Sequence, residues 1–128
     1  MERKYVLAID QSTQGTKAIL FDQVGKFVCR ADRLHQQIVN KKGWISHDLS
    51  EIYQNTIQVV KDVVEKSGIE KNEIACLGIS NQRETSAAWN KNTGEPLADA
   101  IVWQCARAED ICENIKQQGV EEQIRQKT

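Results

Sequence analysis

Short apolar runs separated by polar turns organise the first part of the chain. Residues 5–9 form an apolar run that is short enough for a buried strand, and this run ends at Asp10. Residues 11–16 are all polar or glycine, which is the composition of a turn, and residues 17–22 resume as a second strand. Residues 27–36 predict a third, more exposed strand. The pattern therefore predicts three antiparallel strands in succession, a meander.

A helix and a further strand follow the meander. Asp48 or Ser50 can cap the start of the helix, which runs to about Lys66 and is ended by Gly68. Residues 74–81 are apolar along most of their length, which predicts a central strand covered on both faces. A strand, a helix and a strand that returns to the same sheet form a crossover unit. The predicted apolar face of the helix consists of Ile52, Tyr53, Thr56, Val59, Val60, Val63 and Val64.

The last third of the chain alternates short elements with a marked turn. Residues 86–90 and 100–103 predict short strands, and the segment between them holds Gly94 and Pro96, which are breaker residues. A helix is expected from Ala106 and a shorter one at 120–127. The whole pattern predicts an α/β domain with an antiparallel hairpin edge and a parallel crossover. The inner face of the helix after Ala106 is expected to hold Ile111, Cys112 and Ile115.

Composition narrows the class of protein. The chain has 128 residues, 40% hydrophobic and 27% charged, with a net charge of -1, so nothing electrostatic favours nucleic acid or an acidic membrane as a partner. No apolar run approaches the roughly 20 residues of a membrane span, and the N-terminus offers no signal peptide. The cysteines form no C-x-x-C pair, which favours buried, reduced thiols over a zinc site. These features predict a cytoplasmic protein. The cysteines are Cys29, Cys76, Cys105 and Cys112.

Two polar groups follow strands that the pattern predicts to be parallel, where ligands collect in open α/β sheets. Asp10, with its turn and Lys17, can hold a metal ion and phosphate oxygens, or it can belong to a plain hairpin with a capped turn. Gln82, Arg83 and Glu84 can hydrogen-bond a polyol or sugar, or they can form an exposed loop with a surface ion pair. The spacing alone leaves both alternatives open.

Aromatic residues add one further candidate. Trp103 ends a predicted short strand and can form an apolar wall against the carbon side of a sugar-like ligand, or it can be a partly buried core residue. Trp44 and Trp89 are interpreted as structural. Neither His35 nor His47 has a second metal ligand or a nucleophile at a sequence spacing that indicates a site, so both are predicted to be ordinary surface or loop histidines.

Four segments resemble the N-terminal part of the FGGY carbohydrate kinases, and within that family the members that act on glycerol. The resemblance covers essentially the whole chain and implies an RNase H-like, actin-like ATPase fold. Such kinases have two domains of this fold with a nucleotide cleft between them, and residues 1–128 are expected to form the N-terminal part of the first domain. The resembling segments are 10–17, 43–48, 81–85 and 100–107.

The resemblance also implies roles for residues of the first turn. Asp10 would face Mg²⁺, bound together with ATP, and the phosphates. Thr13, Gln14 and Gly15 would lie along the phosphate loop, and Lys17 would supply a cation near the phosphates. The expected reaction is the transfer of phosphate from ATP to glycerol, which gives glycerol 3-phosphate and ADP.

The second group of residues would bind the acceptor. Arg83 and Glu84 would hydrogen-bond the hydroxyls of glycerol, and Trp103 would pack against its carbon backbone. Two positions depart from the family pattern: Ser12 stands where the family usually has glycine, and Lys17 stands where arginine is usual among the glycerol-specific members. Lysine lacks the bidentate fork of arginine, which leaves room for another sugar or polyol as acceptor.

The resemblance leaves part of the kinase site unmatched. The family's catalytic base, a further glycerol-binding tyrosine and the adenine pocket all lie beyond the matched region, so this chain is expected to hold no catalytic residue. We therefore expect a fragment without appreciable kinase activity of its own. A non-catalytic RNase H-like binding or assembly module is the alternative from another class. Open strand edges and exposed apolar surface would favour a homo-oligomer.

Overall fold

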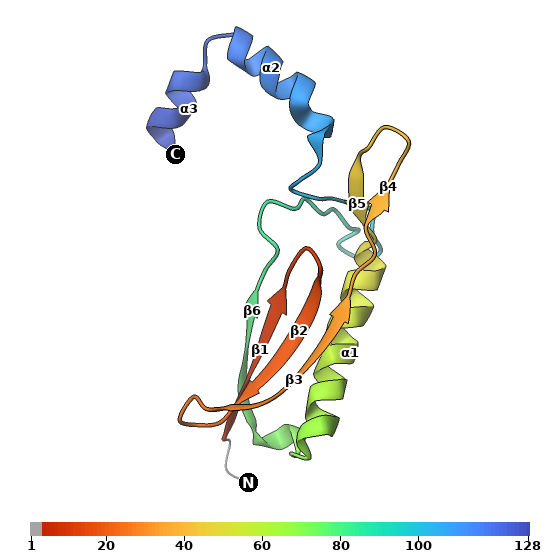
Figure 1. Cartoon of the computed structure of the whole chain (residues 1–128), viewed down its shortest axis with the longest axis vertical. Coiled ribbons are helices and arrows are strands. Elements are labelled where there is room, and N and C mark those ends of the chain that lie inside the picture. The colour runs from red at the N-terminus through yellow and green to blue at the C-terminus, as the bar shows by residue number, and fades with distance from the viewer. Residues whose placement is uncertain (1–3) are drawn as a thin grey trace.

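The computed structural model describes residues 4–128, and its centre is a four-stranded mixed sheet (Figure 1). The strand order is β3-β2-β1-β6. β1 (Tyr5–Gln11), β2 (Gly15–Phe21) and β3 (Phe27–Leu34) are consecutive antiparallel neighbours, and β6 (Ile74–Ser80) runs parallel to β1. The predicted meander and the return of the crossover strand to the same sheet are both confirmed.

Helix α1 (Leu49–Ser67) supplies the connection between the meander and β6, and it packs against β2 and β3. The Asp48 carboxylate accepts hydrogen bonds from the backbone N–H groups of Ser50 (2.8 Å) and Glu51 (3.4 Å), which caps the helix as predicted. Gly68 ends it at φ 70°, in the left-handed region that favours glycine.

The hydrophobic core lies between α1 and one face of the sheet. Val59 and Val63 are fully buried and contribute about 1.5–3 kcal/mol each through removal of apolar surface from water. Tyr53, predicted on the same face, is 63% exposed, so that part of the prediction is wrong: it lies on the first turns of the helix, outside the buried cluster. The buried cluster consists of Leu7, Ala18, Leu20, Cys29, Val59 and Val63.

The prediction of a covered central strand at 74–81 is wrong for the residues that the structure describes. β6 is the edge strand, and Leu77 and Ile79 are 49% and 65% exposed. Both pair in register with buried residues of β1, Leu7 and Ile9, but α1 packs mainly against β2 and β3. Its apolar sequence therefore faces solvent because no element of residues 4–128 packs over it. Cys76 is exposed for the same reason.

A second, small sheet follows the end of the first and has the order β4-β5-β7. Its strands are β4 (Ile38–Val39), β5 (Ile45–His47) and β7 (Ala100–Ile101). The segment 86–90 forms no strand and contributes only isolated bridges, Ser86 to Ile101 and Trp89 to Pro96. A short 3-10 helix, η1 (Lys71–Glu73), precedes β6.

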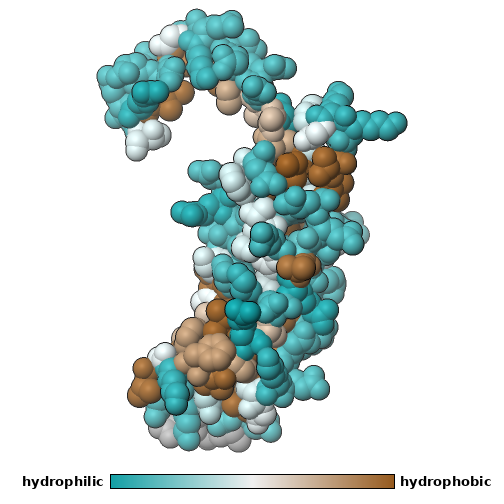
Figure 2. All heavy atoms as spheres, viewed as in Figure 1, coloured by the Kyte–Doolittle hydropathy of each residue, from teal (hydrophilic) through white to brown (hydrophobic). Residues whose placement is uncertain are grey.

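The chain ends in an arm that extends beyond both sheets (Figure 1). It comprises η2 (Ala106–Ala108), α2 (Glu109–Gln117) and α3 (Glu121–Lys127), close to the predicted helices. Figure 2 shows apolar atoms on the concave side of this arm, and Ile111 is 61% exposed, so the described residues leave most of the predicted inner face of α2 uncovered. Cys112 is likewise exposed. Among the described helices, none is both long and apolar enough for a bilayer span.

Candidate functional site

A cavity of about 720 Å³ lies where the parallel strands β1 and β6 end. Asp10 of β1 is in register with Ser80 of β6, so the segments that leave the two strands diverge from the same edge of the sheet. This is the place where open α/β sheets bind ligands. The cavity is lined by Asp10, Gln11, Ser12, Thr13, Ser80, Asn81, Gln82, Arg83, Glu84 and Trp103.

The structure brings five of the eight predicted site residues to this one cavity: Asp10, Thr13, Arg83, Glu84 and Trp103. They come from three separate parts of the chain, yet face a common space. The other three predicted residues, Gln14, Gly15 and Lys17, are outside its lining.

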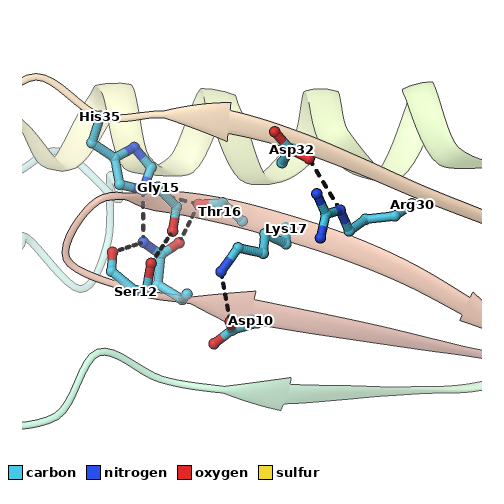
Figure 3. A network of polar contacts seen from close by, with 9 residues as sticks. Asp10, Ser12, Gly15, Thr16, Lys17, Arg30, Asp32 and His35 are labelled. Atoms are coloured by element: carbon cyan, nitrogen blue, oxygen red, sulfur yellow. Dashed lines mark hydrogen bonds and ion pairs between the residues drawn. The ribbon is translucent and has the colours of Figure 1, made fainter.

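Lys17 lies beside Asp10 and outside the lining of the cavity, because it is the cross-strand partner of Asp10 in the β1–β2 ladder. Its Nζ is 3.3 Å from Asp10 Oδ2, and both side chains are more than a third exposed (Figure 3). An exposed pair of this kind contributes little to stability, about 0–1 kcal/mol. Its main consequence is local: the lysine supplies positive charge beside a carboxylate at the cavity, where a Mg²⁺–phosphate group needs both an anionic ligand and a nearby cation. These residues fit such a group.

The turn after β1 is closed by hydrogen bonds of its own. The Ser12 N–H and the Ser12 hydroxyl both donate to the carbonyl oxygen of Gly15, each at 2.9 Å (Figure 3). The hydroxyl of Ser12 is therefore engaged in shaping the turn. Thr13, at its tip, presents its hydroxyl towards the cavity side, where it meets Trp103.

Gly15 is required by strand packing. A Cβ atom at this position would lie 2.3 Å from the carbonyl oxygen of Arg33 on β3. The carbonyl of Gln14 accepts a hydrogen bond from the His35 N–H at 2.9 Å. Gln14 and Gly15 thus contact the end of β3, on the side of the turn away from the cavity.

The segment after β6 is held in an unusual conformation. Glu84 has φ 60° and is the single non-glycine residue of 4–128 in the left-handed region. Such conformations cost of order 1–3 kcal/mol and concentrate at functional sites. The Thr85 hydroxyl fixes the segment, since it accepts from Gln82 Nε2 at 2.8 Å and from the Trp103 N–H at 3.3 Å. The Gln82 Oε1 atom is buried and has no hydrogen-bond partner in the described chain.

Trp103 connects the two sides of the cavity. Its indole Nε1–H donates to the Thr13 hydroxyl at 2.8 Å. The ring itself is 55% exposed, which leaves apolar surface available to the carbon side of a small ligand. The hydrogen bond places the tryptophan of one segment over the turn of another, a contact between residues 90 positions apart.

Arg107 anchors the segment that carries Trp103. Its Nη2 donates to the Ile45 carbonyl at 2.9 Å and to the Ser46 hydroxyl at 2.7 Å, and its Nε donates to Cys105 Sγ at 3.0 Å. Partial burial raises the pKa of Cys105, but the hydrogen bonds from Arg107 and from the Ile45 backbone outweigh burial and leave the pKa below its ordinary value. These hydrogen bonds hold residues 103–107 against β5.

The prediction that His35 and His47 are ordinary surface or loop residues is wrong. His35 is 8% exposed and His47 is fully buried, and their ring centroids are 6.1 Å apart. Burial lowers the pKa of both rings; the charge of His47 lowers that of His35 further, and Glu51 acts in the opposite direction on both. Neither nitrogen of His47 has a hydrogen-bond partner among the described residues.

A polar network beside the turn was missed by the sequence analysis. His35 contacts Gln11, Thr16 and Asn55, which come from β1, β2 and α1. Their separation along the chain hides them, because isolated polar residues in strands and helices carry no local signal of a common cluster. Groups of three or more His, Cys, Asp or Glu side chains suited to a metal ion do not occur in the described part of the chain.

The fold defines the class of protein to which this chain belongs. Residues 5–128 match the N-terminal domain of the FGGY family of carbohydrate kinases, so the chain belongs to that family and has its actin-like ATPase fold. The chain is similar to glycerol kinase 1 of Thermotoga maritima (51% identity over 124 residues) and to glycerol kinase of Treponema denticola (50% over 126 residues). Each match covers 97–98% of this chain but only 25% of the length of the relative.

Solved structures of kinases also match this chain. Plasmodium falciparum glycerol kinase with ADP matches with a TM-score of 0.80 and 35% identity, over 89% of this chain and 23% of that one. Gluconate kinase from Lactobacillus acidophilus matches with a TM-score of 0.86 and 27% identity, over 96% of this chain and 24% of the other. The chain therefore spans about a quarter of the length of the kinases that it resembles.

Proposed function

We propose that this chain forms one wall of the active site of a kinase that transfers phosphate from ATP, bound with Mg²⁺, to glycerol. One observation carries the proposal: a carboxylate and a hydroxyl-bearing turn on one side of a single cavity oppose an Arg–Glu pair and a tryptophan on the other. The identities of 46–51% to glycerol kinases favour glycerol among the acceptors of the family. A kinase of this class works in the cytoplasm, where ATP is available.

We propose that one side of the cavity binds the metal ion and the phosphates and that the other side binds the acceptor. Asp10 would hold the metal ion, and the turn with Thr13 would contact the phosphates, assisted by the charge of Lys17. The bound metal ion and nucleotide supply the phosphoryl group and neutralise its charge during transfer. Gln14 and Gly15 support the turn from behind, towards β3, so their proposed contribution is to its shape.

The acceptor side suits a small polyol. Arg83 presents a fixed fork of N–H donors and Glu84 accepts from hydroxyl groups, so together they can hold two hydroxyls of one ligand in a defined orientation. Trp103 would cover the carbon backbone. Binding of this kind positions a hydroxyl for in-line attack on the phosphoryl group, which is the main contribution that a protein makes to this chemistry.

We propose that the 128-residue chain does not turn over by itself. Phosphoryl transfer needs a base to orient the acceptor, and the nucleotide base needs a pocket of its own. The kinases that this chain resembles are about four times its length, so those parts are proposed to lie in the remainder of the whole protein.

The proposal is tested through the acceptor side. In the complete protein that contains this chain, Arg83→Met should raise the KM for glycerol at least tenfold and leave the KM for ATP within twofold. Arg30→Met is the matched control, because Arg30 lies on β3 and makes only a surface pair with Asp32 at 3.2 Å. Equal effects of the two substitutions would remove Arg83 from the acceptor site.

A second acceptor is favoured by a specific observation. The chain also matches gluconate kinase at 27% identity, and Lys17 stands where arginine is usual in the glycerol-specific members. A panel of glycerol, gluconate and a pentulose, assayed by ADP release, separates these acceptors. Binding of neither MgATP nor any polyol, together with self-association, would instead favour an assembly module.

A further inference from the structure

A buried imidazole joins the turn after β1 to the rest of the domain. His35 follows β3, and its Nε2 lies 3.0 Å from the Thr16 hydroxyl and 2.8 Å from Gln11 Nε2. Its Nδ1 lies 3.0 Å from Asn55 Nδ2 on α1. Figure 3 shows the ring next to the turn that carries Ser12 and Gly15. One side chain therefore contacts the end of β1, the start of β2 and the helix that covers the sheet.

Both ring nitrogens of His35 face polar groups. The Asn55 amide nitrogen donates to the Leu34 carbonyl and also faces His35 Nδ1, both at 3.0 Å. On the other side of the ring, Nε2 faces the Gln11 amide nitrogen at 2.8 Å and the Thr16 hydroxyl at 3.0 Å. A neutral ring has one acceptor nitrogen, which receives an amide N–H, and the Thr16 hydroxyl can donate to Nε2 or accept from it, so it suits either tautomer. A doubly protonated ring would turn a donor towards the Asn55 amide. The titratable groups that face the ring are His47 of β5 and Glu51 of α1.

The main chain adds a second attachment to the same turn. The His35 N–H donates to the Gln14 carbonyl at 2.9 Å, and the Thr16 side chain is fully buried. Thr16 also donates to Gln11 Oε1 at 2.6 Å, which ties the two ends of the turn together. Gln11 and Thr13 belong to the lining of the cavity, whereas His35 does not. The ring can therefore act on the cavity only through the turn.

We infer that His35 is a positioning residue: through Gln11 and Thr16 it fixes the turn at 11–16 relative to the sheet, and thereby sets the geometry with which the turn meets nucleotide phosphates. The inference rests on the proposed function for the nature of the ligand, MgATP. Loss of the ring should weaken the nucleotide contacts of the turn more than the acceptor side, which belongs to the segments after β6 and β7 and meets the turn through the hydrogen bond from Trp103 to Thr13.

The test compares substitutions that keep or remove the hydrogen-bonding group. In the complete protein, His35→Phe should raise the KM for ATP about tenfold, as expected for the loss of about 1–1.5 kcal/mol of hydrogen bonding, and should raise the KM for glycerol by no more than about threefold. His35→Gln, which returns a hydrogen-bonding amide near the position of Nε2, should recover most of the affinity. Thr16→Val, which removes the hydroxyl partner and keeps the shape, should give the same split as His35→Phe.

The matched control is His47→Phe, which removes a buried imidazole that makes no hydrogen bonds in the described chain. It should leave the KM for ATP unchanged. An equal rise in His47→Phe, an unchanged KM for ATP in both His35→Phe and Thr16→Val, or the absence of rescue by His35→Gln would overturn the positioning role.

A separate measurement keeps this inference distinct from the proposed function. If the unmodified protein phosphorylates no polyol, the proposed function fails, and the role of the ring is then read from amide hydrogen exchange in the 128-residue chain. The Ser12 N–H, which donates to the Gly15 carbonyl, should exchange at least tenfold faster in His35→Phe and near the original rate in His35→Gln. Equal rates in the original chain and in His35→Phe would refute the inference.

Discussion

Substitution of Gly15 by alanine tests whether this glycine serves strand packing. The added Cβ would lie 2.3 Å from the Arg33 carbonyl oxygen, whereas close carbon–oxygen contacts begin at about 3.3 Å, so the two strands must separate by about 1 Å. Overpacking of this kind costs about 1–3 kcal/mol. The adjacent hydrogen bond from the His35 N–H to the Gln14 carbonyl would be lost as well, at about 1 kcal/mol. We expect a loss of about 2–4 kcal/mol in the free energy of unfolding.

The assay is equilibrium unfolding of the 128-residue chain in urea, followed by circular dichroism and by tryptophan fluorescence. The matched control is Gly78→Ala on β6, where an added Cβ meets nothing within 4 Å and the backbone lies outside the left-handed region. Alanine should be neutral there, or stabilising by about 0.5–1 kcal/mol, because it lowers the entropy of the unfolded chain.

Two results would refute this reasoning. If Gly15→Ala unfolds at the same urea concentration as the original chain, the close approach of β2 and β3 does not require glycine. If Gly78→Ala loses as much stability as Gly15→Ala, the effect belongs to glycine in strands generally and not to the contact with Arg33.

Three other predictions follow from particular contacts. Burial lowers the pKa of His35 and His47 below 6.5, so just below that pH the unfolded chain binds more protons than the folded chain. The free energy of unfolding should therefore fall as the pH is lowered from 6.5 towards 5. An unchanged urea midpoint over this range would contradict the prediction. Asp48→Ala removes the cap of α1 and should cost about 1 kcal/mol in the same assay, whereas no loss would show that the cap is dispensable. Trp103→Phe removes the hydrogen bond to Thr13 but keeps an apolar ring, so in the complete protein the KM for glycerol should rise by about three- to tenfold; an unchanged KM would place the tryptophan outside the site.

The sequence patterns that predict this fold correctly are local. The meander follows from short apolar runs separated by turns, and α1 follows from a period near 3.6 with Asp48 and Gly68 at its ends. The sequence pattern also predicts that β1 and β6 end at the same edge of the sheet, because two strands joined by a crossover connection run parallel. This is why Asp10 and Arg83 were correctly expected at one edge of the sheet.

The errors arise where burial depends on distant partners. The apolar sequence of β6 predicts a covered strand, but whether a strand is covered depends on elements elsewhere in the chain. His47 is buried because it pairs with Ala100 across 53 positions, which no local pattern encodes. Gly15 was expected to lie along the phosphate loop. Its close contact with the Arg33 carbonyl could not be predicted, because it depends on how β3 packs beside β2.

We propose that the cavity between the turn after β1 and the segment after β6 is the acceptor and phosphate site of a polyol kinase. The most direct test of this proposal is ADP release by the complete protein with MgATP, in the presence and absence of glycerol, beside an Asp10→Asn variant. We predict ADP release that depends on glycerol, is matched by an equal amount of glycerol 3-phosphate, and falls at least a hundredfold in Asp10→Asn. Turnover that is independent of every polyol offered, or that is unchanged by Asp10→Asn, would contradict it.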